Sequence, residues 1–142
     1  MSLDKISISS EFALRIASHY YSEETYFHAM RVASYVFDND MIPDEYKNDC
    51  VVLAIMHDLI EDTEYTGEGL PFNLLNALKL LSKPKNMDYI EYIKNIKNTH
   101  GIHWKECAYW VKLADMKDHL SQRETLTDRL KEKYLNALAY LL

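Results

Sequence analysis

The segment LAIMHDLIEDT, residues 53–63, holds the densest group of side chains that could do chemistry. Directly after its apolar start, one histidine and three carboxylates fall within six positions, at His57, Asp58, Glu61 and Asp62. On one helix, which advances about 100° per residue, these side chains share an arc of roughly 140°. Carboxylates in the last turn of a helix are disfavoured by its negative end and repel one another, and a divalent cation reverses both penalties. The segment is therefore either a solvated helix end or part of a metal site.

Asp115 is an acidic residue at a position where a core residue is expected. It continues the i, i+4, i+7, i+11 spacing of one apolar helical stripe that begins with Trp104, Ala108 and Val111. A buried carboxylate needs a charged or hydrogen-bonding partner, so Asp115 requires one from elsewhere in the fold. A buried salt bridge, a helix cap or a metal ion would each provide that partner.

His28 lies on a mostly apolar helix face with Val32. A single histidine on such a face is more often a hydrogen-bonded core residue than a ligand. Together with His57, Asp58 and Asp115, however, it supplies two imidazoles and two carboxylates from three predicted helices. This set suits one octahedral divalent metal with open positions for water, and its mixed nitrogen and oxygen donors favour Mn, Fe, Ni or Zn over Ca.

Apolar residues at helical spacing predict seven helices that position these side chains, and no alternating strand pattern exceeds four residues. The expected helices span residues 11–20, 22–38, 44–62, 71–82, 87–100, 103–122 and 126–142. Ser22 is an expected start of the second helix, Pro43 fits the start of the third, and Pro84 ends the fourth. The sequence therefore predicts an all-α fold, with six or seven helices in one compact domain over residues 1–142.

The formal net charge of −6 limits the classes of partner. It leaves no basic excess to neutralise the phosphates of duplex nucleic acid or the surface of an anionic membrane. A small anionic substrate needs only a local cluster of cations. The lysines that could form such a cluster are Lys83, Lys85, Lys94, Lys97 and Lys112.

The chain carries no sequence signal for secretion or membrane insertion. No stretch reaches the roughly 18 apolar residues of a membrane span, and the first residues lack the basic start and apolar middle of a signal peptide, so we expect a cytoplasmic protein. Cys50 and Cys107 lie in apolar helical patterns without CxxC spacing, which favours buried free thiols over a disulfide.

The upstream His28, the doublet His57-Asp58 at a helix end and the distant Asp115 resemble the HD superfamily of metal-dependent phosphohydrolases. The extension HDLIEDT and the later VKLAD are more specifically similar to the hydrolase domain of the RelA/SpoT family and its small stand-alone relatives, which remove the 3′-pyrophosphate of (p)ppGpp. The resemblance spans about residues 12–120 and implies a single HD-type helical bundle.

The resemblance also implies a role for each chemistry-bearing residue. One divalent metal, usually Mn²⁺ in this family with Fe, Ni, Zn or Co as alternatives, would be bound by His28, His57, Asp58 and Asp115. Glu61 and Asp62 would match the pair that positions and activates the attacking water. The physical reading agrees, because a metal lowers the pKa of bound water and an adjacent carboxylate accepts its proton.

Three further residues are candidates for substrate binding. Arg31 lies one turn after His28 and could reach a phosphate beside the metal. Lys112 lies one turn before Asp115 and could do the same. For both residues, a solvated surface charge is the alternative. His119 stands four residues after Asp115, where the family often has asparagine.

The leading hypothesis is a metal-dependent phosphohydrolase that acts on a nucleotide, and its most specific version is a (p)ppGpp 3′-pyrophosphohydrolase. The alternative within enzymes is an HD-domain hydrolase of another nucleotide, a mono- or triphosphate. The segment HYYSEETYFH, residues 19–28, keeps that alternative open, because it is shorter than its counterpart in the family and contains no Lys or Arg. A third hypothesis is a helical module that binds metal without catalysis. The sequence makes no prediction of the oligomeric state.

Overall fold

Eight helical segments make up the part of the chain that the computed structural model describes, which is residue 6 and residues 8–142. They are α1 (Ser10–Tyr20), α2 (Glu23–Asp38), α3 (Asp44–Met56), α4 (Leu59–Asp62), α5 (Phe72–Leu80), α6 (Tyr89–Lys97), α7 (His103–Ser121) and α8 (Asp128–Leu141). Helix α4 is a single turn of four residues, and the other seven have nine or more. The described residues include no strand, so the predicted all-α fold is confirmed.

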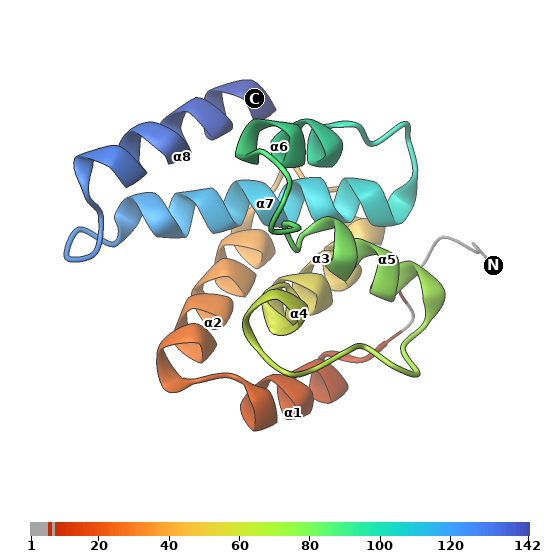
Figure 1. The fold of residues 1–142 in the computed structure, drawn as a ribbon. Helices are drawn as coiled ribbons and strands as arrows, with labels where there is room; N and C mark the ends of the chain where they lie inside the picture. Colours follow the sequence, from red (N-terminus) through yellow and green to blue (C-terminus); the bar gives the residue numbers. More distant parts are fainter. Residues whose placement is uncertain (1–5, 7) are drawn as a thin grey trace.

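Helix α7 crosses the middle of the molecule (Figure 1). It packs against α2, α3 and α5 on one side and against α6 and α8 on the other. Ten of its 19 residues are buried, and these include the charged residues Lys112, Asp115 and Asp118. Charged groups in such a position need partners from the neighbouring helices, and this requirement selects the residues that surround α7.

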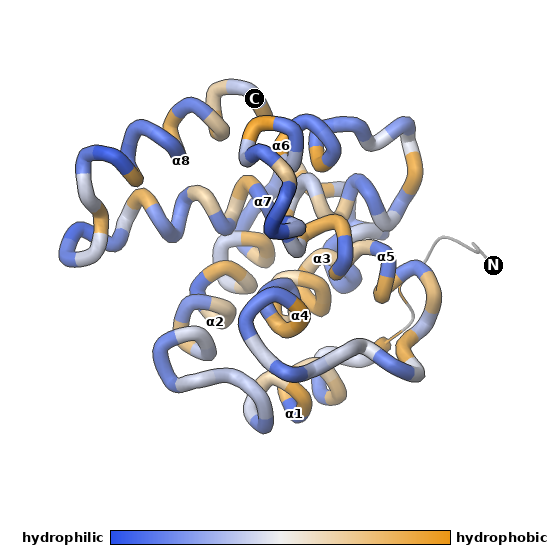
Figure 2. Tube along the Cα trace, viewed as in Figure 1, coloured by the Kyte–Doolittle hydropathy of each residue, from blue (hydrophilic) through white to orange (hydrophobic). Residues whose placement is uncertain are grey.

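Helix α3 forms the centre of the apolar core. Residues 52–56 are all buried, so this half of the helix is apolar on every side, as expected for a helix that is surrounded by others. It packs between α1, α2, α5 and α7. Figure 2 shows hydrophobic residues gathered around α3 and α4, whereas α8 is mostly hydrophilic.

Local signals explain most helix boundaries. The side chain of Ser22 accepts a hydrogen bond from the backbone N–H of Thr25, which confirms Ser22 as the predicted start signal of α2. Helix α6 ends at Lys97, before the predicted boundary at residue 100. The reason is that His100 and Gly101 both have positive φ, at 49° and 71°, which a right-handed helix cannot include.

The predicted helix over residues 44–62 is wrong in one respect, because it is broken at His57 and Asp58. The Tyr21 hydroxyl inserts at the break: it donates to the carbonyl of Ile55 at 2.8 Å and accepts the backbone N–H of Asp58 at 3.2 Å. His57 Nδ1 donates a hydrogen bond to the carbonyl oxygen of Ala54 at 2.6 Å. Side chains thus replace hydrogen bonds of the helix ladder, which breaks the helix.

Two other predictions can be compared directly with the structure. Cys50 and Cys107 are both buried and free, as predicted. Among the described residues, no helix combines the length with the apolar character that crossing a membrane requires.

Candidate metal centre

The four predicted ligands come together at one point. His28 comes from α2, His57 and Asp58 come from the break between α3 and α4, and Asp115 comes from α7. His28 Nε2 lies 2.8 Å from Asp115 Oδ1 and 3.5 Å from Asp58 Oδ2. His57 Nε2 lies 3.3 Å and 3.2 Å from the same two oxygens. Adjacent donors around an octahedral ion with bonds of about 2.1 Å are about 3 Å apart, so the spacing suits one metal ion.

The backbone orients the imidazole of His57. Its Nδ1 lies 2.6 Å from the carbonyl oxygen of Ala54, which can only accept a hydrogen bond, so Nδ1 carries the proton. In the neutral imidazole, Nε2 then presents its lone pair to Asp58 and Asp115. This is the arrangement that a metal-binding histidine needs, because a fixed Nδ1–H holds both the tautomer and the ring orientation.

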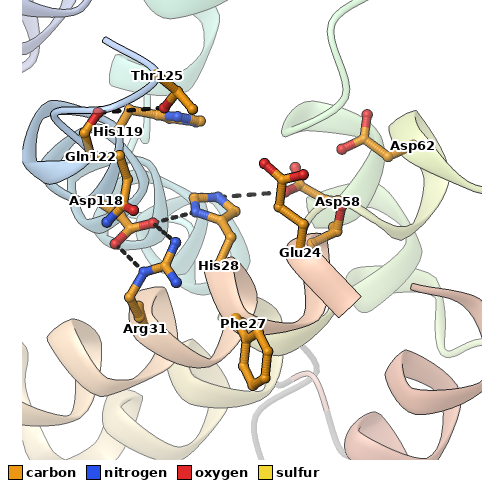
Figure 3. Close-up of a pocket in the computed structure, with 11 residues that line it drawn as sticks. Glu24, Phe27, His28, Arg31, Asp58, Asp62, Asp118, His119, Gln122 and Thr125 are labelled. Carbon is orange, nitrogen blue, oxygen red and sulfur yellow. Dashed lines mark hydrogen bonds and ion pairs between the residues drawn. The ribbon is translucent and has the colours of Figure 1, made fainter. Parts of the chain in front are cut away.

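Asp118 orients the imidazole of His28 in the same way. His28 Nδ1 lies 2.6 Å from Asp118 Oδ2, and Arg31 donates to both oxygens of Asp118, at 2.8 Å and 3.0 Å (Figure 3). Burial raises the pKa of Asp118, but the hydrogen bonds from Arg31 and His28 outweigh it and lower the pKa below its usual value. The carboxylate is therefore ionised and accepts the Nδ1–H, so that in the neutral imidazole, as a metal would bind it, the lone pair of His28 Nε2 faces the centre.

The centre requires a positive charge between its donors. Burial disfavours the imidazolium form of His57, but Asp58 and Asp115 outweigh burial and raise the pKa of His57 well above its usual value. Lys112 Nζ donates a hydrogen bond to the other oxygen of Asp115 at 2.9 Å. Although burial raises the pKa of Asp115, the charge of Lys112 and the imidazole hydrogen bonds outweigh it and lower the pKa. Two neutral imidazoles would point lone pairs at a carboxylate, which is repulsive. In the metal-free protein, protons on the imidazoles supply the positive charge between the donors, and a divalent cation can replace these protons.

Glu61 and Asp62 lie beside the centre in different environments. Glu61 Oε1 accepts the backbone N–H of Lys83 at 2.9 Å, which fixes its carboxylate. Asp62 makes no side-chain hydrogen bond within the described part of the chain, and one oxygen from each of Asp58, Glu61 and Asp62 can be chosen so that all three lie within 4.8 Å of one another. Burial and the charges of Asp58 and Glu61 raise the pKa of Asp62 to about 6. Asp62 is therefore the carboxylate that is free to accept a proton near the predicted ligands.

Two cavities border the centre, and Asp58, Asp62 and His119 line both. The first, of about 360 Å³, is drawn in Figure 3, and we name it the polar cavity. Its other lining residues are Glu24, Thr25, Phe27, His28, Arg31, Asp118, Gln122 and Thr125. The second, of about 250 Å³, we name the lysine cavity, and its other lining residues are Glu61, Lys83, Tyr89, Tyr92, Lys112, Asp115, Met116, Lys133 and Tyr134.

The candidate substrate-binding residues all lie at this site, but not as free surface charges. Arg31 lines the polar cavity while it is paired with Asp118, and Lys112 is buried against Asp115. His119 Nε2 lies 3.3 Å from Asp115 Oδ1. Of the five lysines that the sequence suggested as a cluster, Lys83 and Lys112 line the lysine cavity and the other three line neither cavity.

Sequence reasoning missed four residues of this site. Asp118 could have been found, because it lies three residues after Asp115 and so on the same helix face. Tyr21 gave no signal in the sequence. Lys133 and Tyr134 belong to α8, beyond the stretch that carries the family resemblance. Lys133 Nζ lies 4.2 Å from the centre of the Tyr89 ring, and burial together with the nearby lysines lowers the pKa of Lys133.

The donor set is that of a metal centre that could activate water. Two oriented imidazoles and two carboxylates suit a divalent first-row metal, and a carboxylate without a hydrogen bond lies next to them. Cavities on both sides leave room for a substrate at the same point. No protein-family model matches the chain, and a comparison with curated proteins finds no significant match.

Proposed function

We propose that this protein is a metal-dependent phosphohydrolase that acts on a nucleotide. The observation that carries the proposal is the orientation of two imidazoles. His28 and His57 each commit Nδ1 to an oxygen acceptor, so their Nε2 atoms converge with the carboxylates of Asp58 and Asp115. A divalent cation satisfies all four groups at once, and Mn²⁺ is our first choice, with Fe, Ni, Zn or Co as alternatives.

The chain would contribute three functions to the reaction. A bound cation supplies a water of lowered pKa and polarises a phosphoryl oxygen. Asp62 accepts the proton of the attacking water, because its carboxylate makes no hydrogen bond to any residue that the structure describes and lines both cavities. Glu61 orients that water, since its hydrogen bond to the backbone of Lys83 holds it in place. His28 and His57 keep their donor atoms aligned through the bonds made by Nδ1.

The two cavities suggest how a nucleotide would lie across the centre. Lys83, Lys112 and Lys133 line the lysine cavity together with four carboxylates, and a divalent cation that offsets those carboxylates would leave the lysines to face phosphate groups. The polar cavity instead offers Phe27, which is 51% exposed, and neutral polar groups that suit a nucleoside. The proposed substrate therefore carries phosphates on the lysine side of the scissile bond.

This arrangement favours (p)ppGpp 3′-pyrophosphohydrolase as the most specific version, because a pyrophosphate leaving group would occupy the lysine cavity. Hydrolysis of another nucleotide, a mono- or triphosphate, is the second candidate. It is favoured by the pairing of Arg31 with Asp118, which offsets the charge of the guanidinium and uses two of its N–H groups, so that it is a weaker partner for a second phosphate cluster in the polar cavity. A metal-binding module without catalysis is the third candidate, and the unbonded Asp62 argues against it.

The test is a substrate panel on protein whose metal content is known. Metal is removed with a chelator, Mn²⁺ is restored, and ppGpp, GTP and GMP are each incubated with the protein while the products are separated by ion-exchange chromatography. Release of pyrophosphate from ppGpp is expected. Turnover of GTP or GMP alone would favour the second candidate, and tight metal binding without turnover of any nucleotide would leave the third.

Lys133→Gln tests the placement of the phosphates. We expect KM for the hydrolysed nucleotide to rise about threefold to tenfold, because one cation is lost from an exposed position at the cavity, while metal affinity stays unchanged. Lys131→Gln is the matched control, since Lys131 is exposed on the same helix and lines neither cavity. Equal KM values in the two variants would remove the lysine cavity from the proposal.

A further inference from the structure

His119 occupies the position of an additional donor at the centre. It lies on α7 one turn after Asp115, and its Nε2 is 3.3 Å from Asp115 Oδ1, the same distance as His57 Nε2. The donor atoms of His28, Asp115 and His119 form a group within 4.8 Å that could hold a metal ion, and His28 also belongs to a second such group with His57 and Asp58. We propose that His119 is a fifth protein ligand of the divalent cation, an inference that rests on the metal centre of the proposed function.

Hydrogen bonding alone does not account for the crowding at Asp115 Oδ1. Three imidazole nitrogens, from His28, His57 and His119, lie within 3.3 Å of this single oxygen. A carboxylate oxygen has two lone pairs and so cannot accept three N–H groups with good geometry. Separations of 2.8 Å to 3.3 Å also match the roughly 3 Å between adjacent ligands of one ion. Hydrogen bonds from His28 and His57 already use this oxygen, and one cation among the three nitrogens would also give the nitrogen of His119 a partner.

Helix α8 holds the ring of His119 in place. The ring stacks on Tyr134, with centroids 4.7 Å apart and planes 14° from parallel. Stacking fixes the ring plane and leaves Nε2 directed towards Asp115. The side chain of His119 is 37% exposed and borders both cavities, so it would be the most exposed of the proposed ligands.

A third imidazole predicts which metals the centre selects. Three nitrogen and two oxygen donors favour first-row transition metals such as Fe, Co, Ni or Zn, as well as Mn, over the all-oxygen preference of Mg²⁺ and Ca²⁺. The structure thus assigns to His119 a role in metal selectivity that asparagine, a weaker oxygen donor, would not provide.

The experiment uses Co²⁺ as the probe, because its visible absorption depends on the number and type of its ligands. Metal-free wild-type protein, His119→Asn and His119→Gln are titrated with Co²⁺ in competition with a chromophoric chelator. We expect both variants to bind Co²⁺ about tenfold or more weakly and to give an altered visible spectrum. His100→Asn is the control, because His100 is exposed and its positive φ is one that asparagine adopts readily.

The outcomes separate this inference from the proposed function. If wild-type protein binds no Co²⁺, the metal centre fails and both proposals fall. If wild-type protein binds Co²⁺ and the His119 variants match it in affinity and spectrum, only the fifth ligand is overturned, and a loss of activity alone would then make His119 a substrate contact. Circular dichroism and thermal unfolding of the metal-free variants check that they fold.

Discussion

At the scale of single residues, the orientation of the donors depends on the hydrogen bond that Nδ1 of each imidazole makes. The carbonyl oxygen of Ala54 accepts the hydrogen bond from His57 Nδ1. The buried carboxylate of Asp118 accepts the one from His28 Nδ1 and is itself held by a hydrogen bond from Arg31. These contacts orient donors that would otherwise rotate or bond elsewhere. Residues that would touch no metal are therefore expected to contribute to the proposed metal affinity, and substitution tests this.

Arg31→Gln distinguishes a positioning role from phosphate binding. Because Arg31 holds both oxygens of Asp118, its loss should loosen His28 and weaken Co²⁺ binding about 10- to 100-fold, as measured by chelator competition. Arg15→Gln, an exposed change on α1, is the control. Unchanged metal affinity with a raised KM would instead support the substrate-binding role that the sequence suggested.

Asp62→Asn should stabilise the metal-free protein while it abolishes hydrolysis. The pKa of Asp62 is raised from 3.8 to about 6, so the ionised carboxylate is disfavoured in the folded state. This penalty is fully present above the folded pKa and absent below the unfolded one. Thermal unfolding with chelator should therefore show a higher Tm for the variant at neutral pH, and the difference should vanish below about pH 3.8. A difference that does not change with pH would contradict this electrostatic cause.

At the scale of elements, the break between α3 and α4 is what directs Asp58 to the centre. Burial raises the pKa of Tyr21, so its hydroxyl stays protonated and can donate to Ile55 while it accepts from Asp58. The single turn of α4 then carries Glu61 and Asp62 to the edge of the two cavities. The hydroxyl of Tyr21, directly after α1, thus contributes to the positions of His57, Asp58, Glu61 and Asp62.

Tyr21→Phe removes that hydroxyl and leaves a buried carbonyl and N–H without their partner. The expected loss is about 1–3 kcal/mol in the free energy of unfolding, with weaker metal binding because Asp58 is no longer held. Urea unfolding of the metal-free protein and Co²⁺ titration measure the two effects. Tyr20→Phe is the control, since Tyr20 is exposed and its hydroxyl bonds to none of the described residues. Wild-type metal affinity in Tyr21→Phe would show that the break does not depend on Tyr21.

At the scale of the whole molecule, the candidate metal centre joins parts of the chain that are far apart in sequence. It links α2, the α3–α4 break and α7. Helix α8 packs against α7 on the side away from α2 and α3. A cation at this point would cross-link the halves of the molecule that pack on either face of α7. Binding to the folded state alone then raises stability by mass action.

Mn²⁺ should therefore raise the Tm of the metal-free protein. At about 100 times its Kd the gain is about 2.7 kcal/mol, or roughly 5–10 °C for a chain of this size. Differential scanning calorimetry with and without Mn²⁺ measures it, and a chelator should reverse it. His28→Gln should show no such rise, and an equal rise with Ca²⁺ would contradict a centre with nitrogen donors.

The sequence by itself determined the fold class, most helix boundaries and the types of donor. Helical periodicity is local, so it reveals that Asp115 interrupts an apolar stripe and that His57 and Asp58 end an apolar run. The acid on the stripe is buried and paired, as that pattern predicted. The roles assigned to these residues through the family resemblance stay predictions.

Only the tertiary structure decided which groups face one another. His28 and Asp118 are separated by 90 residues, and Tyr21 and Ile55 by 34, so no spacing rule could pair them. The break at His57 depends on a hydroxyl from another helix, and the place of His119 depends on the stacking of Tyr134 from α8. The physical reason is that hydrogen bonds and ring contacts depend on the packing of helices, which local sequence periodicity does not specify.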